Sequence, residues 1–147
     1  MKGTEEGIQI EIHDAQEVVP FDLELVRDRS QLALPLCLSE AVTGSPLTGI
    51  DSLEASIVSD DDITKVHKEF MDDSSPTDVI TFDYGEIISS AETALRQSNE
   101  MEVSVEKELV LYIIHGMLHL AGYRDGTSEE SNQIIELQEK ILAEVWW

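Results

Sequence analysis

The pattern of apolar and polar residues predicts four strands. Near the N-terminus Ile8, Ile10 and Ile12 alternate with polar residues, as in a half-buried strand. A less regular alternation over residues 53–59 predicts a second strand. Residues 79–82 and 86–89 form two short apolar runs separated by a turn-like segment that contains Gly85, and these predict the third and fourth strands.

The same pattern predicts helices between and after these strands. Asp22 is a plausible N-cap for a helix that runs to about residue 40, and Pro35 predicts a kink or an early stop within it. The apolar side of this helix is expected to carry Leu23, Val26, Leu32 and Leu36. A turn region over 44–49 follows. Shorter helices are expected at 63–71, after three consecutive aspartates, and at 91–97.

Two further helices are predicted in the C-terminal part of the chain. The first runs from about residue 102 to 121 and is apolar nearly all round over residues 109–120, so we expect it at the centre of the fold. Gly122 should end it. The second begins at Ser128 and should face inward through Ile134, Leu137, Ile141 and Leu142. Strands and helices are mixed without regular βαβ alternation, which predicts an α+β fold: a small mixed sheet packed by helices, with a buried central helix.

Composition narrows the class of protein. The 147 residues contain no internal repeat and no long linker, so we expect one domain over residues 1–147. One cysteine, Cys37, excludes an intrachain disulfide, and neither a signal-like N-terminus nor an apolar stretch of about 18 residues is present. We therefore expect a soluble cytoplasmic protein that does not enter a membrane.

The net charge of −22, from 9 basic and 31 acidic residues, repels phosphate backbones at long range. It fits either a strongly solvated, salt-adapted surface or an acidic face that docks onto a basic protein.

The predicted central helix carries a candidate metal site. His115 and His119 are four residues apart, so their side chains project from one face and can bind one ion at about 2.0–2.1 Å. Gly122 can turn the chain back, and Asp125 can then supply a third ligand. Three protein ligands leave one position for water, which is typical of a catalytic zinc site. Satisfied core histidines are the simpler interpretation of such a pair, but two unpartnered imidazoles in an apolar helix are costly.

A peptidase is disfavoured by Gly116. Zinc peptidases of the His-Glu-x-x-His type use the glutamate after the first histidine as general base, and this chain has glycine there.

Two segments resemble the YbeY family of metal-dependent endoribonucleases, which are also called ribosomal RNA maturation factors. The first is His-Gly-Met-Leu-His-Leu-Ala-Gly-Tyr at 115–123, close to the family pattern His-Gly-x-Leu-His-Leu-x-Gly-Tyr. The second is Pro-Thr-Asp-Val-Ile-Thr-Phe at 76–82, followed by Gly-Glu-Ile-Ile. The resemblance runs in register from about Asp51 to Val145.

This resemblance implies a small α+β cytoplasmic protein with one zinc ion in a cleft, acting in maturation and quality control of small-subunit ribosomal RNA. His115 and His119 match the first two family ligands. Asp125 stands where most members have a third histidine, so the resemblance implies an altered ligand set. The helix before the second segment has Met71 where the family has an arginine that can bind phosphate, and His67 where it has asparagine.

Other residues are further candidates for roles in the site. Asp78 could be a hydrogen-bond partner of a metal-binding imidazole or a simple turn carboxylate. Arg124 could meet a phosphate or be merely exposed, and His67 could approach the cleft, although a solvated histidine is the simpler interpretation. No residue stands out as general base, so a water activated by the ion is the expected nucleophile.

The leading hypothesis is a zinc-dependent endoribonuclease that cuts single-stranded RNA, with other divalent metals as alternatives to zinc and ribosomal RNA as partner. The rival is a non-catalytic ribosome-assembly factor that keeps the fold and the metal and docks on a ribosomal protein or another assembly factor. Met71 and the charge of −22 favour the rival, whereas the intact helical motif favours the enzyme.

Overall fold

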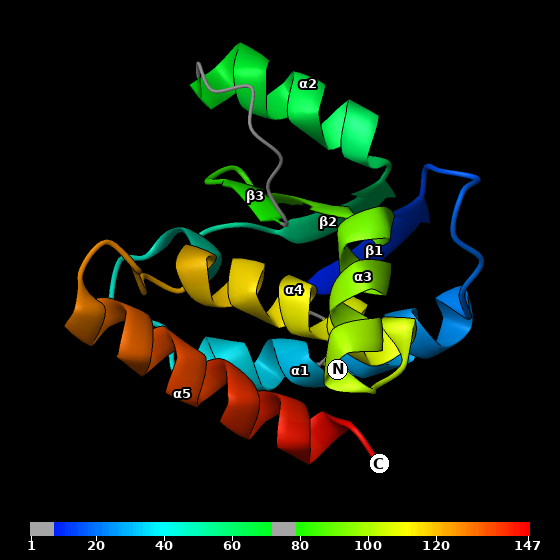
Figure 1. The fold of residues 1–147 in the computed structure, drawn as a ribbon. Helices are drawn as coiled ribbons and strands as arrows, with labels where there is room; N and C mark the ends of the chain where they lie inside the picture. The colour runs from blue at the N-terminus through cyan, green and yellow to red at the C-terminus, as the bar shows by residue number, and fades with distance from the viewer. Residues whose placement is uncertain (1–7, 72–78) are drawn as a thin grey trace.

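A computed structural model describes residues 8–71 and 79–147, and in this part of the chain four strands form one mixed sheet (Figure 1). The strands lie in the order β1-β2-β4-β3. Strand β2 pairs in parallel with both β1 and β4, and β3 pairs with β4 in the antiparallel direction. The strand at one edge is therefore β3, which matters for the site described below. The strands are β1 (Gln9–Asp14), β2 (Ser52–Val58), β3 (Val79–Phe82) and β4 (Glu86–Ser90).

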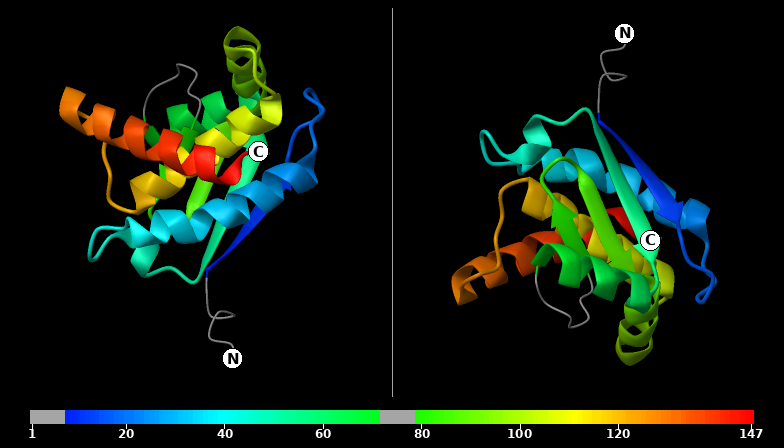
Figure 2. Two further views of the ribbon diagram at one scale, coloured as in Figure 1. Left: turned by 90° about the horizontal axis from the view of Figure 1, so that it is seen from below. Right: turned by 90° about the horizontal axis from the view of Figure 1, so that it is seen from above.

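Helices cover both faces of this sheet. Helices α1 and α4 lie on one face with α5 outside them, whereas α2 lies on the other face (Figures 1 and 2). The helices are α1 (Leu23–Ser39), α2 (Asp60–Met71), α3 (Ala91–Met101), α4 (Val105–Leu120) and α5 (Ser128–Val145), and a short 3₁₀ helix covers Pro46–Thr48. The mixed sheet packed by helices confirms the predicted α+β class.

The main core surrounds α4. This helix packs against α1, α3, α5 and the strands β3 and β4, and Leu109, Ile113, Ile114, Met117 and Leu118 are fully buried. Burial of nearly every face explains why its sequence lacks a polar stripe. The central position predicted for this helix is thus confirmed.

A smaller apolar cluster fills the space between α2 and the opposite face of the sheet. Ile63 of α2 meets Ile80 of β3 and Ile88 of β4, with Val58 and Val66 around them. Because Ile80 faces this cluster, the alternate β3 residue Thr81 faces the α4 side. The edge of the sheet therefore presents polar side chains toward the end of α4.

Helix α1 differs from its prediction at two positions. Asp22 caps it as expected, with its carboxylate accepting from the Leu25 amide at 3.2 Å. Leu32, predicted to face inward, is 48% exposed, because the buried stripe runs through Val26, Ser30, Ala33, Leu34 and Cys37 instead. Pro35 was predicted to cause a kink or an early stop; it lies inside the helix, so the early stop is wrong and the kink stays a prediction.

Helix boundaries elsewhere shift by a few residues. The predicted start of the central helix at 102 is wrong: Glu102 adopts a left-handed conformation that ends α3, and Ser104 caps α4. The aspartates predicted to precede α2 form its first turn, where they suit the positive end of the helix dipole.

The two C-terminal tryptophans, whose role the sequence left open, both contact the side chain of Arg29. The guanidinium of Arg29 lies 3.4 Å from the ring centroid of Trp147 and 5.5 Å from that of Trp146, and it also donates to the Val145 carbonyl.

Among the described residues, no helix combines the length and hydropathy that a bilayer crossing would need.

Candidate metal centre

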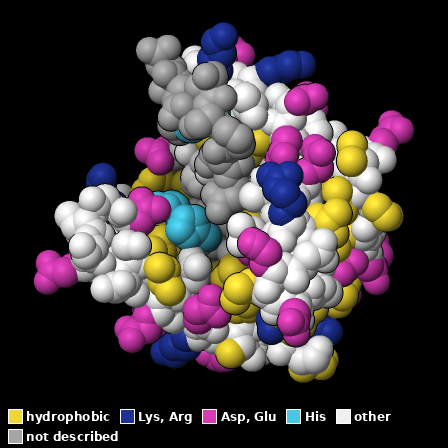
Figure 3. Space-filling model, viewed as in Figure 1, with side chains coloured by type: hydrophobic (Ala, Val, Ile, Leu, Met, Phe, Trp, Pro, Cys, Tyr) yellow, Lys and Arg dark blue, Asp and Glu magenta, His cyan; other side chains and the backbone are white. Residues whose placement is uncertain are grey.

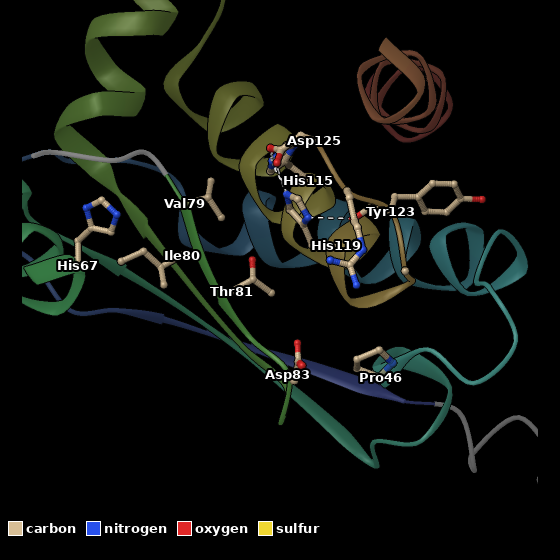
Figure 4. Close-up of a pocket in the computed structure, with 12 residues that line it drawn as sticks. Pro46, His67, Val79, Ile80, Thr81, Asp83, His115, His119, Tyr123 and Asp125 are labelled. Atoms are coloured by element: carbon tan, nitrogen blue, oxygen red, sulfur yellow. Dashed lines mark hydrogen bonds and ion pairs between the residues drawn. The ribbon is translucent and has the colours of Figure 1, made fainter. Parts of the chain in front are cut away.

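A cleft of about 530 Å³ lies where the C-terminal end of α4 meets the edge strand β3. Its lining comes from α4 and the turn after it, from β3, and from His67 of α2. Figure 3 shows histidine side chains in a hollow of this face, with acidic side chains nearby. Figure 4 shows His115, His119 and Asp125 on the α4 side, facing Thr81 and Asp83 across the cleft.

The three predicted ligands converge on one point. The Nε2 atoms of His115 and His119 are 3.0 Å apart, and the Asp125 Oδ2 lies 3.7 Å from the first and 3.5 Å from the second. A tetrahedral ion with bonds of about 2.0–2.2 Å holds its ligand atoms about 3.3–3.6 Å from one another. The spacing of these three atoms therefore suits a single small cation, and the structure brings the predicted set together.

Hydrogen bonds at the far side of each ring orient the imidazoles. The carbonyl of Tyr123 can only accept, so the 3.0 Å contact with His119 Nδ1 requires an N–H there. His119 Nε2 then carries the lone pair, and it faces His115 Nε2 and Asp125 Oδ2 across the space that a cation would fill. His115 Nδ1 similarly lies 2.7 Å from the amide oxygen of Gln138 on α5. Such partners on the remote nitrogen are typical of metal-binding histidines.

The charge states also suit a metal site. Burial lowers the pKa of His119, the neighbouring His115 lowers it further, and the Asp125 carboxylate opposes both. The neutral imidazole, which is the form that binds metal, is therefore favoured at neutral pH. About a quarter of each histidine side chain is exposed, so the ligand atoms remain open to the cleft.

The turn after α4 places Asp125 beside the histidines. Gly122 has φ +104°, and a Cβ there would lie 2.9 Å from Val42 Cβ, so glycine meets both the conformational and the packing requirement. The Tyr123 hydroxyl donates to the Glu40 carbonyl at 2.8 Å, which ties the turn to the end of α1. The chain can then double back and bring Asp125 over the last turn of α4.

Gly116 packs so closely against the sheet that the glutamate found at this position in zinc peptidases would not fit. A Cβ at this position would lie only 2.8–2.9 Å from three side-chain atoms of Ile87 on β4. The residue therefore faces the sheet, not the cleft. A glutamate here would meet the core, which strengthens the argument against a peptidase.

The other candidates fall in different places. Arg124 lines the cleft and is exposed, and within the described residues it has no acidic partner. His67, expected to be solvated, is partly buried and also lines the cleft. Asp78 lies outside the described residues, and so does the side chain of Met71.

Two features of the site were missed in the sequence. Gln138 was not singled out, because one glutamine in an amphipathic helix carries no local signal of its contact with His115 23 residues away. Asp83 also lines the cleft, and only the pairing of β3 as an edge strand brings it there.

Comparison with known proteins gives consistent matches. A sequence model of the family described as endoribonuclease YbeY matches residues 11–146. The endoribonuclease YbeY of Thermotoga neapolitana is 40% identical over 97 residues, which cover 61% of this chain and 64% of that protein. The chain thus spans just under two thirds of the length of that relative.

Two further matches cover most of the chain. The endoribonuclease YbeY of Symbiobacterium thermophilum is 30% identical over 156 residues, covering 92% of this chain and 96% of that protein. A solution structure of a Thermotoga maritima protein matches with a TM-score of 0.62 at 27% identity, covering 94% and 89% of the two chains.

Proposed function

The chain belongs to the YbeY family of endoribonucleases, and we propose that it is a zinc-dependent endoribonuclease that cuts single-stranded RNA. The observation that carries this proposal is the convergence of His115, His119 and Asp125 at an open cleft. The relatives named as endoribonucleases support the reaction class. We further propose ribosomal RNA as substrate, with a role in its maturation and quality control in the cytoplasm.

The two imidazoles and the carboxylate would hold the ion. Nitrogen and oxygen donors in a three-residue set favour zinc, although other divalent metals accept the same donors. A bound ion would polarise a phosphate oxygen and lower the pKa of water. Because all three donors come from α4 and the turn after it, the site depends on one helix and its C-terminal cap.

The chain itself would position the RNA. Arg124 follows Tyr123 directly, and its exposed guanidinium at the lip of the cleft can donate two hydrogen bonds to a phosphate. His67 lines the cleft from α2 and adds a second polar group. These residues would have to offset the repulsion from a chain of net charge −22, so RNA binding should weaken when Arg124 is lost and should depend on the salt concentration.

The test combines metal analysis with RNA cleavage. Purified protein should contain about one zinc per chain, cleave a single-stranded RNA, lose activity with chelator and regain it with added zinc. His115→Ala should abolish cleavage, which also excludes a contaminating nuclease. Arg124→Gln should weaken RNA binding, and Met71→Arg, which restores the family residue, should raise the rate. Equal cleavage by wild type and His115→Ala would refute the proposal.

The net charge of −22 favours a second candidate function, a non-catalytic ribosome-assembly factor that docks on a basic ribosomal protein or another assembly factor. This function predicts salt-sensitive binding to a basic ribosomal protein that His115→Ala leaves unchanged. Metal binding without RNA cleavage, together with such docking, would favour it over the enzyme.

A further inference from the structure

Gln138 of α5 contacts the first candidate ligand from behind. Its Oε1 atom lies 2.7 Å from Nδ1 of His115, and both side chains are partly buried. We infer that Gln138 is a positioning residue that holds His115 in the tautomer and ring orientation needed for metal binding. This inference rests on the metal site of the proposed function.

The chemistry of the imidazole explains the role. A neutral imidazole carries one N–H, on Nδ1 or on Nε2. When Nδ1–H donates to the Gln138 oxygen, Nε2 keeps its lone pair, which then faces His119 Nε2 at 3.0 Å and Asp125 Oδ2 at 3.7 Å. In the other tautomer Nε2–H would point into the site and block coordination. With its amide oxygen toward the ring, as in this structure, Gln138 therefore favours the form that can bind.

The two histidines differ in how this selection is achieved. His119 donates to the backbone carbonyl of Tyr123, which no side-chain substitution removes. His115 depends on a side chain from another helix. The helix that carries this side chain is well anchored, because α5 packs on the core through Ile134, Ile141 and Leu142. A rigid element is what an orienting hydrogen bond requires.

One side of the His115 ring is not fully covered by packed side chains. A second cavity of about 230 Å³ adjoins it and is lined in part by Gln97, Leu111 and Gln138. His115 and Val79 thus form a wall between this cavity and the main cleft. Because this side of the ring borders a cavity, the hydrogen bond to Gln138 adds to the contacts that keep the ring facing the cleft.

The experiment compares two substitutions at 138 with the same two at Gln133, an exposed residue of the same helix. Gln138→Met keeps the length of the side chain but removes the acceptor, whereas Gln138→Glu keeps an acceptor. Gln133→Met and Gln133→Glu control for the loss of an amide and for the added charge. Zinc affinity is measured by competition with a chromogenic chelator, and the His115 tautomer is measured by long-range ¹H–¹⁵N NMR of the metal-free protein above pH 8.

We expect Gln138→Met to weaken zinc binding about 10–100-fold, as loss of such partners does elsewhere. Gln138→Glu should bind at least as tightly as wild type, and both Gln133 variants should match their parent apart from the small effect of charge. In the metal-free wild type His115 should carry its proton on Nδ1, and Gln138→Met should lose this preference.

Zinc affinity within about twofold of wild type in Gln138→Met, or a His115 proton on Nε2 in the wild type, would overturn the inference. Failure of the proposed metal site has a different signature: no zinc binding by the wild type although His115 still carries Nδ1–H. That result would refute the metal site and leave the orienting hydrogen bond supported.

Discussion

Replacing Gly116 with alanine should destabilise the protein, although alanine favours helices over glycine. The new Cβ would lie 2.8 Å from Cγ2 of Ile87 and 2.9 Å from its Cγ1 and Cδ1. Ile87 is fully buried and β-branched, so its side chain has little freedom to move aside. Helix α4 or strand β4 would have to shift instead.

The magnitude follows from two opposing terms. Overpacking a well-filled core costs about 1–3 kcal/mol, and three contacts below 3.0 Å with a stiff neighbour favour the upper half of that range. The higher helix propensity of alanine offsets about 1 kcal/mol of this cost. The free energy of unfolding should thus fall by about 1–2 kcal/mol, which for a chain of this size lowers Tm by about 2–8 °C.

Urea and thermal unfolding of chelator-treated protein would measure this change without a contribution from bound metal. The matched control is the same substitution in an Ile87→Ala background, which removes all three close atoms. There Gly116→Ala should become neutral or stabilising by up to about 1 kcal/mol, because only the propensity term remains. A stabilising Gly116→Ala in the wild-type background would refute the close approach of α4 to β4.

Three further outcomes are expected. Zinc at 100 times its Kd should stabilise the protein by about 2.7 kcal/mol, which is seen as a higher Tm; an equal shift in His119→Ala would contradict the ligand assignment. Burial lowers the pKa of His119 below its usual 6.5, so the unfolded chain binds the proton first as the pH falls. The stability from neutral His119 is therefore complete above pH 6.5 and is lost as the pH falls through the folded-state pKa, and urea unfolding of metal-free protein should show this loss in wild type but less of it in His119→Ala. Burial also raises the pKa of the Cys37 thiol to about 12, so Ellman's reagent at pH 8 should label it only after unfolding, and rapid labelling of the native protein would contradict the burial.

Features with a local cause could be predicted from the sequence. The helix around His115 was predicted from its apolar run, the end of that helix from Gly122, and the cap of α1 from Asp22. The spacing of His115 and His119 places them on one face of any α-helix, whatever surrounds it. That these residues and Asp125 bind a metal remains a prediction.

Other features depend on contacts between distant segments. Leu32 was wrongly predicted to be buried, because the face that α1 turns inward is decided by the helices and strands it packs on. The strand order β1-β2-β4-β3 makes β3 the edge and so brings Asp83 to the cleft.

The position of each orienting group was likewise decided by tertiary structure. Periodicity and capping act over a few residues, so they reveal which side chains share a face of a helix. They carry no information on which side chain another helix will place there. The pairing of Gln138 with His115, and the contact of Gly116 with Ile87, exist only because α5 and β4 pack on opposite sides of α4.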